Sequence, residues 1–373
     1  MKVIDIIAGA RPNFMKVAPI IRAIDASRAQ GGVLSYRLVH TGQHYDAKMS
    51  QDFFTQLGIP APQVNLEVGS GTQAEQTAAI MVRYEKVLLE ARCDLCLVVG
   101  DVNSTMACAI TAQKLRVPVA HVEAGIRSGD WAMPEEINRM VTDSITDWFF
   151  TTSEVANGNL RRAGVAEGRI FFVGNTMIDT LLANLGKLRP PGFADDIPLR
   201  AGGYLVVTLH RPSNVDRPES LAALLSAIVE GGRGLPVVFP VHPRTAKALD
   251  ALGPLPATLH RVDPQPYLEF NWLVKNAKAV ITDSGGVTEE TTVLGVPCMT
   301  LRDSTERPET VSLGTNGLIG TDPTALAPAF ERLFTGRWQR GTVPPLWDGR
   351  TGERIVAVLE GLLVPGAGAI ARP

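Results

Sequence analysis

Carboxylates and histidines follow several apolar runs of this sequence, where a buried strand would end. Asp101 comes after "LCLVVG", Glu123 after "VPVAHV", and Glu135 begins a helical pattern in "PEEINRM". His210 and His242 follow "YLVVTL" and "PVVFPV" in the same way. Carboxylates and imidazoles can transfer protons near neutral pH. The pattern predicts acid–base chemistry, and the alternative is a structural role for each acid as a helix cap or a charge at a helix dipole.

An anion-binding pattern, "TDSGGVTEE", follows the apolar run "AKAVI". Ser284 suits a helix N-cap, and Gly285 and Gly286 let an anion approach backbone N–H groups that have no partner inside the helix. Glu290 shares a helix face with Gly286, and its carboxylate could accept hydrogen bonds from ribose hydroxyls. Glu289 is rotated off that face, so we expect it to be solvated.

Cations accompany these groups. Arg11 and Lys16 lie in "GARPNFMK" after the first apolar run, and Arg244 lies in "PVHPR". Each of them could contact a phosphate, and each could also be a solvated surface charge. Lys16 stands among apolar neighbours on a predicted helix, where a lysine can extend its ammonium to water without any function. Arg11 is the stronger candidate because it lies in the strand-to-helix turn itself.

Glu123 needs compensation for its charge. A carboxylate at the end of a buried strand is costly to desolvate unless a cation pairs with it. We expect Arg127 or Arg139 to be that partner. Such a pairing is compatible with a catalytic role.

The runs that position these residues predict an α/β protein. Continuous apolar strands alternating with helical patterns indicate doubly wound parallel sheets, each covered by helices on both faces. We predict a first domain over 1–185, a Pro- and Gly-rich linker over 186–202, a second domain over 203–363 and a loose tail over 364–373. The predicted strands lie in "KVIDIIA", "YRLVHT", "LCLVVG", "VPVAHV", "WFFTTS", "IFFVG", "YLVVTLH", "PVVFPV", "AVITDS" and "VPCMTL".

The composition argues against nucleic acid, a membrane or a metal ion as a partner. The 373 residues carry a net charge of -2, with no basic block of the kind that binds nucleic acid. No apolar stretch reaches membrane length and no signal peptide is evident, so we expect a soluble cytoplasmic protein. Cys93 and Cys96 form a C-x-x-C, but Cys96 lies in an apparent buried strand and nothing completes a zinc tetrad. We therefore predict no metal site.

The sequence lacks the two common nucleotide-binding motifs. No G-x-G-x-x-G follows the first strand, and the sequence holds no G-x-x-x-x-G-K-[ST]. Tight binding of NAD or ATP is therefore not expected, and we predict no cofactor. The pattern favours a nucleoside diphosphate that carries another group.

Motifs spread in order over nearly the whole chain resemble those of the bacterial non-hydrolysing UDP-N-acetylglucosamine 2-epimerases. The resemblance implies two Rossmann-like domains of the GT-B type facing across a cleft, with UDP on the second domain and the sugar in the cleft. It also implies a homodimer and no nicotinamide. The motifs are "GARPNFMKVAP", "GDVNST", "HVEAGIRSGD", "PEEINR", "GNTMIDTL", "PVHPR", "TDSGGVTEE", "RDSTERPE" and "WDGRTGERI".

The resemblance also implies roles for individual residues. The catalytic carboxylates of the family fall on Asp101, Glu123 and Glu135. The UDP site of the family falls on Arg11, His210, Ser284, Gly285, Gly286 and Glu290, with Arg302 and Glu306 nearby.

The reaction expected from the resemblance inverts carbon 2 of UDP-N-acetylglucosamine by anti elimination of UDP to 2-acetamidoglucal and re-addition. Three alternatives stay open. These are epimerisation of a UDP-2,3-diacetamido uronic acid, hydrolytic release of N-acetylmannosamine with UDP, and glycosyl transfer on the same fold. A sugar-nucleotide sensor without turnover is a further, less favoured reading.

Departures from the usual family motifs leave room for the first alternative. Ala10 and Asn13 replace the usual residues of the first motif. Tyr45 and Pro212 stand where members activated by a second substrate molecule carry other groups. We therefore do not expect allosteric activation, and a modified sugar remains open.

Overall fold

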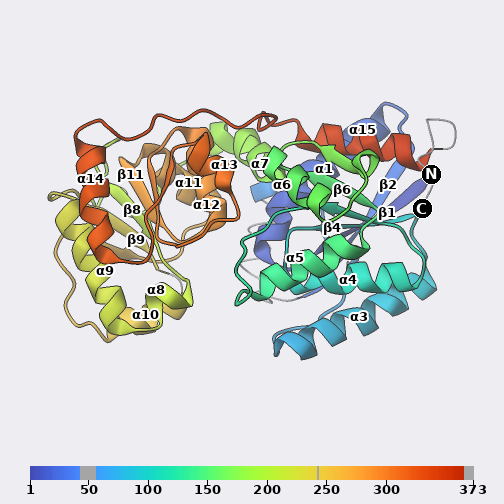
Figure 1. Ribbon diagram of the computed structural model, residues 1–373, viewed down its shortest axis with the longest axis horizontal. Coiled ribbons are helices and arrows are strands. Elements are labelled where there is room, and N and C mark those ends of the chain that lie inside the picture. The colour runs from blue at the N-terminus through green and yellow to red at the C-terminus, as the bar shows by residue number, and fades with distance from the viewer. Residues whose placement is uncertain (43–55, 242, 365–373) are drawn as a thin grey trace. The chain divides into compact units, whose positions relative to one another are not determined.

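Two compact units make up the protein. The computed structural model describes residues 1–42, 56–241 and 243–364. Unit 1 comprises Met1–Ala183 with Pro345–Pro373, and unit 2 comprises Asn184–Pro344. Each unit is built on its own parallel sheet (Figure 1), as the continuous apolar runs predict.

Unit 1 contains a seven-stranded sheet in the order β3-β2-β1-β4-β5-β6-β7. All neighbouring strands are parallel, and β1 pairs along its whole length with β2. The chain order reverses between β1 and β4, and ligands of such sheets bind outside the carboxyl ends of the strands at that reversal. The strands are β1 Lys2–Ala8, β2 Leu34–His40, β3 Val64–Asn65, β4 Leu95–Val99, β5 Val119–Val122, β6 Trp148–Thr151 and β7 Ile170–Phe172.

Helices cover both faces of this sheet. α3 and α4 pack on one face, where Tyr84 of α3 meets Ile7 of β1 in a buried apolar cluster. α1 and α15 pack on each other and lie on the opposite side of the sheet (Figure 1). The helices are α1 Arg11–Ala29, α3 Gln73–Glu90, α4 Asn103–Lys114, α5 Pro134–Ile145, α6 Glu154–Arg162, α7 Thr176–Asn184 and α15 Thr351–Leu363.

Unit 2 repeats the arrangement with six strands in the order β10-β9-β8-β11-β12-β13. Side chains alternate along β8, so Leu205 and Val207 face α9 and α14 whereas Val206 faces α11. The strands are β8 Leu205–Thr208, β9 Val237–Pro240, β10 Leu259–Val262, β11 Ala279–Thr282, β12 Cys298–Thr300 and β13 Asn316–Leu318. The helices are α8 Pro212–Val215, α9 Pro218–Gly231, α10 Pro243–Asp250, α11 Tyr267–Asn276, α12 Gly285–Leu294, α13 Pro308–Ser312 and α14 Leu326–Phe334.

Each predicted strand is observed, and three further strands were missed by the sequence reasoning. The missed strands, β3, β10 and β13, all lie at sheet edges. An edge strand has one neighbour and need not be apolar on both faces, so it lacks the continuous run that marks a central strand. β10 reads "LHRV" and β13 reads "NGL".

The last helix belongs to unit 1, although the sequence reasoning placed residues up to 363 in the second domain. Gly352 at the start of α15 donates its N–H to the carboxylate of Asp179 at 2.8 Å, and Ser27 of α1 donates to Glu360 at 2.5 Å. Trp347, just before α15, donates its indole N–H to the Thr152 carbonyl at 2.9 Å. Asp179, Ser27 and Thr152 lie far from α15 in the sequence. Local sequence patterns therefore did not indicate that the chain returns to unit 1.

The segment predicted as a linker, 186–202, also differs from the prediction. It is largely irregular, but it belongs to unit 2. Phe193 and Leu199 pack against the core cluster that contains Tyr204. Of the predicted tail, residues 365–373 lie outside the described residues.

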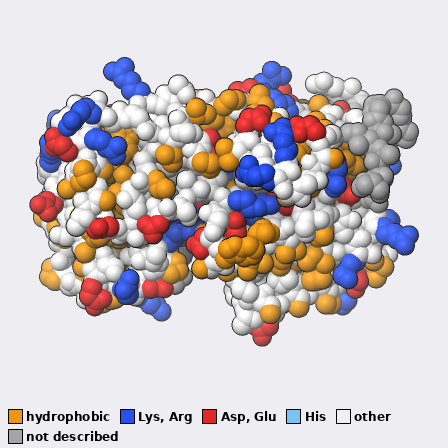
Figure 2. Space-filling view, viewed as in Figure 1, with side chains coloured by type: hydrophobic (Ala, Val, Ile, Leu, Met, Phe, Trp, Pro, Cys, Tyr) orange, Lys and Arg blue, Asp and Glu red, His pale blue; other side chains and the backbone are white. Residues whose placement is uncertain are grey.

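The surface carries both signs of charge. On the face shown in Figure 2, acidic and basic side chains are interspersed, and none of the basic ones form a broad patch there. Among the described helices, none is both long enough and apolar enough to cross a bilayer.

Gly174 packs against the segment that returns to unit 1, so a larger residue at this position should destabilise the fold. Gly174 has φ +103°, and a Cβ added there would lie 2.1 Å from the Leu346 carbonyl oxygen, whereas Gly164 has φ +85° and open space around it. We expect Gly164→Ala to lower the free energy of unfolding by the cost of left-handed backbone alone, about 1–2 kcal/mol. Gly174→Ala should cost clearly more, because the 346 carbonyl must also move. Urea unfolding of both variants measures the difference, and equal losses would show that the close approach contributes nothing.

Candidate functional site

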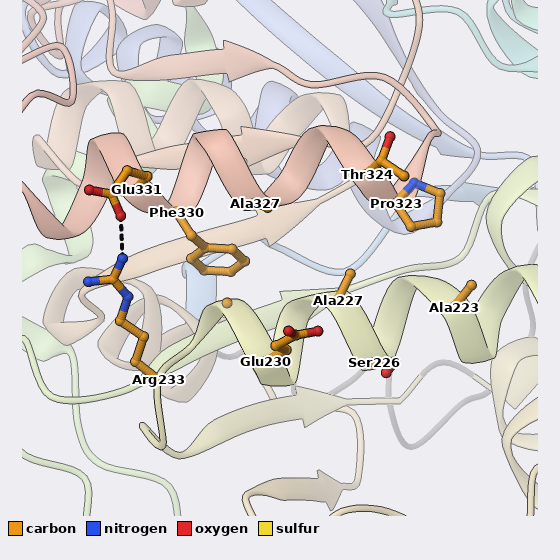
Figure 3. Close-up of a pocket in the computed structure, with 11 residues that line it drawn as sticks. Ala223, Ser226, Ala227, Glu230, Arg233, Pro323, Thr324, Ala327, Phe330 and Glu331 are labelled. Atoms are coloured by element: carbon orange, nitrogen blue, oxygen red, sulfur yellow. Dashed lines mark hydrogen bonds and ion pairs between the residues drawn. The ribbon is translucent and has the colours of Figure 1, made fainter.

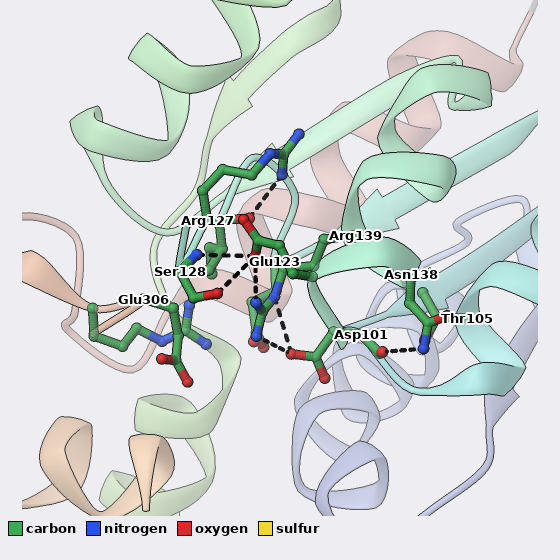
Figure 4. Close-up of polar contacts among 12 residues, drawn as sticks. Asp101, Thr105, Glu123, Arg127, Ser128, Asn138, Arg139 and Glu306 are labelled. Atoms are coloured by element: carbon green, nitrogen blue, oxygen red, sulfur yellow. Dashed lines mark hydrogen bonds and ion pairs between the residues drawn. The ribbon is translucent and has the colours of Figure 1, made fainter. Parts of the chain in front are cut away.

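The predicted carboxylates of unit 1 lie at the carboxyl edge of its sheet. Asp101 follows β4, Glu123 follows β5, and Glu135 lies in the first turn of α5. β4 and β5 are neighbours, and β4 is one of the two strands at the reversal of chain order. Figure 4 shows Asp101 and Glu123 among the polar side chains of this region.

Asp101 is held by a buried arginine. Arg139 of α5 donates to the same carboxylate oxygen from Nε at 3.1 Å and from Nη2 at 2.6 Å (Figure 4). The side chain of Arg139 is 3% exposed, whereas that of Asp101 is 24% exposed. Asp101 does not cap α4, because the N-cap position is Val102. The charge-assisted pair therefore fixes Asp101 while leaving part of its carboxyl group accessible.

Glu123 pairs with Lys16, a partner that the sequence reasoning did not name. The Lys16 Nζ lies 2.6 Å from a Glu123 carboxylate oxygen, and both side chains are at least nine-tenths buried. Lys16 therefore does not extend its ammonium to water, which was one of the two predictions for it. The pairing was not predicted because Lys16 and Glu123 are remote in the sequence and only the fold brings them together.

The backbone at Glu123 is strained. Its φ is +72°, in the left-handed region that residues with a Cβ rarely adopt. The N–H groups of Glu123 and Ala124 both donate to the Phe150 carbonyl, at 2.9 and 3.1 Å, which holds the conformation. Strained backbone of this kind persists only where the surroundings impose it, and it concentrates at functional sites.

Glu136, the residue after Glu135 in α5, organises the loop that follows β5. Its carboxylate accepts hydrogen bonds from the N–H groups of Ser128 and Gly129, at 2.9 and 3.1 Å, and from Arg139 at 2.7 Å. Burial alone would raise the pKa of Glu136, but these donors outweigh it and hold the pKa below its usual value. Glu135, the predicted catalytic residue beside it, is half-buried.

Asn13 organises the turn after β1. Its side-chain oxygen accepts the N–H groups of Gly9 and Ala10, both at 3.0 Å, and its amide donates to the Val99 carbonyl at the end of β4 at 3.2 Å. The position that departs from the family motif thus ties together the two strands at the reversal. Arg11 begins α1 as expected, but its side chain lies outside the described residues.

In unit 2, a histidine and an aspartate meet at the equivalent reversal, between β8 and β11. The Nδ1 atom of His210 lies 2.8 Å from a carboxylate oxygen of Asp283. The same carboxylate accepts the N–H groups of His210 and Arg211, at 3.0 and 2.9 Å. Burial would raise the pKa of Asp283, but the His210 contact, followed by the backbone donors, lowers it. Because a carboxylate can only accept here, Nδ1 donates, and in the neutral ring Nε2 is the atom able to take up a proton. Sequence reasoning missed Asp283.

The glycine-rich helix start has the features of an anion site. Ser284 occupies the N-cap position of α12, but its side chain makes no capping hydrogen bond. A Cβ on Gly285 would lie 2.7 Å from Glu306 Oε1, so the end of the Glu306 side chain would have to move to admit a larger residue. Arg302 pairs with Glu306 through Nη2 at 2.6 Å, and its buried Nη1 has no hydrogen-bond partner among the described residues. A cation with an unused donor beside a helix N-terminus favours an anion at that place.

Glu290 is buried one turn further along α12. It accepts a hydrogen bond from the Asn271 amide at 3.3 Å, and burial raises its pKa to about 7. Glu289 is not solvated as predicted but is 1% exposed and ion-paired with Arg307. Arg307 directly precedes α13, and the sequence pattern did not predict that it pairs with Glu289.

Besides Arg11, two further predicted binding residues fall wholly or partly outside the described residues. His242 lies outside the described residues, and so does the side chain of Arg244. The four cysteines are free and buried. Among the described residues, no group of three or more His, Cys, Asp or Glu side chains is arranged to hold a metal ion.

A hollow of about 640 Å³ in unit 2 is a separate feature. It lies between α9 and α14, with Phe330 on its wall and the Arg233–Glu331 ion pair at one end (Figure 3). None of the residues predicted for the site line it. Small apolar side chains line it together with the charged residues Glu230, Arg233 and Glu331.

Comparison with known proteins identifies the family. The family model described as UDP-N-acetylglucosamine 2-epimerase matches residues 27–360 of the chain. The chain belongs to this family. The resemblance drawn from the sequence motifs is thereby confirmed, and the chain is an enzyme of the epimerase class.

Relatives of this epimerase agree over most of its length. It is 42% identical over 368 residues to the UDP-N-acetylglucosamine 2-epimerase of Methanocaldococcus jannaschii, covering 95% of this chain and 98% of that protein. It is also 42% identical over 324 residues to the UDP-2,3-diacetamido-2,3-dideoxy-D-glucuronate 2-epimerase of Pseudomonas aeruginosa, covering 86% and 88%.

Solved structures agree as well. A crystal structure of the Methanocaldococcus jannaschii UDP-GlcNAc 2-epimerase in complex with UDP-GlcNAc and UDP has a TM-score of 0.86 and 41% identity to this epimerase. The match covers 96% of this chain and 99% of that one. The GT-B type of fold with two Rossmann-like domains, expected from the sequence, is confirmed.

The buried pairing of Arg139 leads to a stability prediction. Arg139→Met would leave the nearly buried Glu136 and the partly buried Asp101 without their cation, and such losses cost on the order of 3–5 kcal/mol. Arg161→Met is the matched control, because Arg161 pairs with Glu154 and Glu167 on the surface. We expect a large fall in unfolding free energy for the first variant and little change for the second. Similar losses in the two variants would contradict this account of the network.

Proposed function

We propose that this epimerase inverts carbon 2 of a UDP-N-acetylhexosamine, converting UDP-N-acetylglucosamine to its manno epimer. The observation that carries the proposal is the pair of carboxylates, Asp101 and Glu123, held at the ends of neighbouring strands by one buried cation each. The named activity of the similar Methanocaldococcus jannaschii protein supports the choice of substrate.

The chemistry explains why several acids are needed. The proton on carbon 2 is not next to a carbonyl, so its direct removal by a carboxylate faces a prohibitive barrier. Departure of UDP first develops positive charge at carbon 1, which acidifies the neighbouring proton. Loss of that proton gives 2-acetamidoglucal and UDP. Protonation of the alkene from the other face, with return of UDP to carbon 1, gives the epimer.

This route requires a base and an acid on opposite faces of carbon 2 and a cradle for the departing diphosphate. Asp101, Glu123 and Glu135 are the proposed proton-transfer or cation-stabilising groups. His210, oriented by Asp283, is a fourth candidate. This scheme does not assign which of these groups is the base and which is the acid.

The diphosphate is proposed to bind at the start of α12. Its backbone N–H groups and Arg302 would stabilise the charge that grows on UDP as the bond to carbon 1 breaks. Arg11, His242 and Arg244 are further proposed contacts to the UDP-sugar, and Lys16 was predicted as another. Because Lys16 already pairs with Glu123, its role in this scheme is to compensate that carboxylate.

A second substrate is favoured by one specific observation. The relative that acts on UDP-2,3-diacetamido-2,3-dideoxy-D-glucuronate is as similar in sequence, at 42%, as the one named for UDP-N-acetylglucosamine. The reaction at carbon 2 would be the same. The difference would lie at carbons 3 and 6 of the sugar.

Proton NMR in heavy water tests the function. The protein is incubated with UDP-N-acetylglucosamine, and carbon 2 and free UDP are followed together. Deuterium at carbon 2 of an intact UDP-linked product is the expected result. Accumulation of free N-acetylmannosamine and UDP would replace the proposal by hydrolysis, and exchange on the diacetamido uronate alone would replace the substrate.

Variants assign the proposed roles. Asp101→Asn and Glu123→Gln should slow deuterium incorporation by about 10²–10⁴-fold, the usual contribution of a positioned acid or base. Glu167→Gln, at a surface ion pair, is the control and should leave the rate unchanged. Full activity of either site variant would remove that residue from the mechanism.

The raised pKa of Glu290 predicts pH-dependent binding of UDP. If its carboxylate accepts hydrogen bonds from ribose hydroxyls, the proton must leave before UDP binds. Below the pKa of about 7, the Kd for UDP should therefore rise about tenfold for each pH unit. Calorimetric titrations of the wild type and of Glu290→Gln between pH 5.5 and about 8 separate this effect from titration of UDP itself. A constant ratio of the two Kd values over that range would contradict the assignment.

A further inference from the structure

A buried histidine connects the two loops that carry the proposed catalytic carboxylates. His121 lies in β5 and is 0% exposed. Its Nδ1 lies 2.8 Å from Oδ1 of Asp143 in α5, and its Nε2 lies 2.8 Å from the Gly100 carbonyl oxygen. A carboxylate and a carbonyl can only accept, so both bonds form together only when both ring nitrogens carry protons.

The bond to Gly100 acts directly on Asp101. The Gly100 carbonyl and the Asp101 N–H belong to one planar peptide unit. On its amino side, Gly100 is already held by the sheet, since its N–H donates to the Val122 carbonyl at 3.0 Å. His121 holds the carbonyl oxygen of Gly100. It thereby fixes the orientation of the Gly100–Asp101 peptide plane, and with it the direction in which the Asp101 side chain points.

The bond to Asp143 reaches the other loop. The second oxygen of Asp143 accepts the Gly125 N–H at 3.1 Å and the Arg127 guanidinium at 2.6 Å. Gly125 lies two residues after Glu123, whose backbone is strained at φ +72°. Burial would raise the pKa of Asp143, but the contacts with His121 and Arg127 lower it. The carboxylate is therefore the form that holds this loop.

We propose that His121 is a positioning residue of the reaction, which together with Asp143 sets the placement of Asp101 relative to Glu123. This inference rests on the proposed function. Val119, two residues earlier and on the same face of β5, is buried and apolar, so this face of the strand also accepts an apolar side chain. A buried polar ring is costly unless its hydrogen bonds are made. One of the two bonds ends on Gly100 in the loop after β4, and the other ends on Asp143, which holds Gly125 in the loop after β5.

The test compares two variants with a control. His121→Phe keeps a ring of similar size but removes both donors, and Asp143→Asn keeps the shape of the carboxylate partner but removes its charge. His260→Phe, at edge strand β10 of unit 2, is the control. For each protein, kcat and KM for the UDP-sugar, the Kd for UDP and the thermal unfolding midpoint are measured.

We expect His121→Phe to lower kcat about 100-fold, the loss that a displacement of about 1 Å causes, with KM and the Kd for UDP within about threefold of wild type. Asp143→Asn should lower kcat in the same direction, and His260→Phe should leave it unchanged. ¹⁵N NMR of histidine-labelled wild-type protein should show one buried ring with protons on both nitrogens.

Several outcomes would overturn the inference. A His121→Phe protein with wild-type kcat and a lower unfolding midpoint would make the residue purely structural. Equal losses in kcat and UDP affinity would indicate general disorder of the fold. If His121→Phe does not fold, Asp143→Asn decides by the same criteria. Wild-type protein inactive on both UDP-sugars would refute the proposed function instead, and the NMR signature would still test the two hydrogen bonds.

Discussion

The ion pairing of Arg139 is the interaction on which the site of unit 1 depends. Its guanidinium contacts Asp101 and Glu136 together while being 3% exposed. Two carboxylates in such a place would repel each other without that cation, and each would be costly to bury. Glu136 in turn holds the N–H groups of Ser128 and Gly129. One buried charge thus connects the loop after β4 with the loop after β5.

Helix α5 supplies most of this order. Glu136, Asn138, Arg139 and Asp143 all point from it towards the ends of β4 and β5, and Asn138 donates to the Asp101 carbonyl at 2.9 Å. Groups fixed in this way do not need to reorganise when charge develops in a transition state, which is the main source of electrostatic catalysis. The cost of burying so many polar groups is offset because they satisfy one another.

The sequence predicted the parts of the fold that local patterns encode. Central strands such as "LCLVV" are apolar on both faces, so all of them were found, and with them Asp101, Glu123 and His210 at their ends. Partners were predicted poorly. Lys16 for Glu123 and Arg307 for Glu289 come from segments remote in the chain, and so does the packing of α15 on α1. Burial and pairing of a charge depend on what the fold brings beside it, and a single sequence does not record that.

The proposed mechanism requires carboxylates of unit 1 on both faces of carbon 2 of the sugar. A crystal structure of the protein with UDP-N-acetylglucosamine bound tests it most directly. We expect a carboxylate oxygen of Asp101, Glu123 or Glu135 on each face of carbon 2, within about 3–3.5 Å. A bound sugar whose carbon 2 meets none of these carboxylates would refute the proposed mechanism.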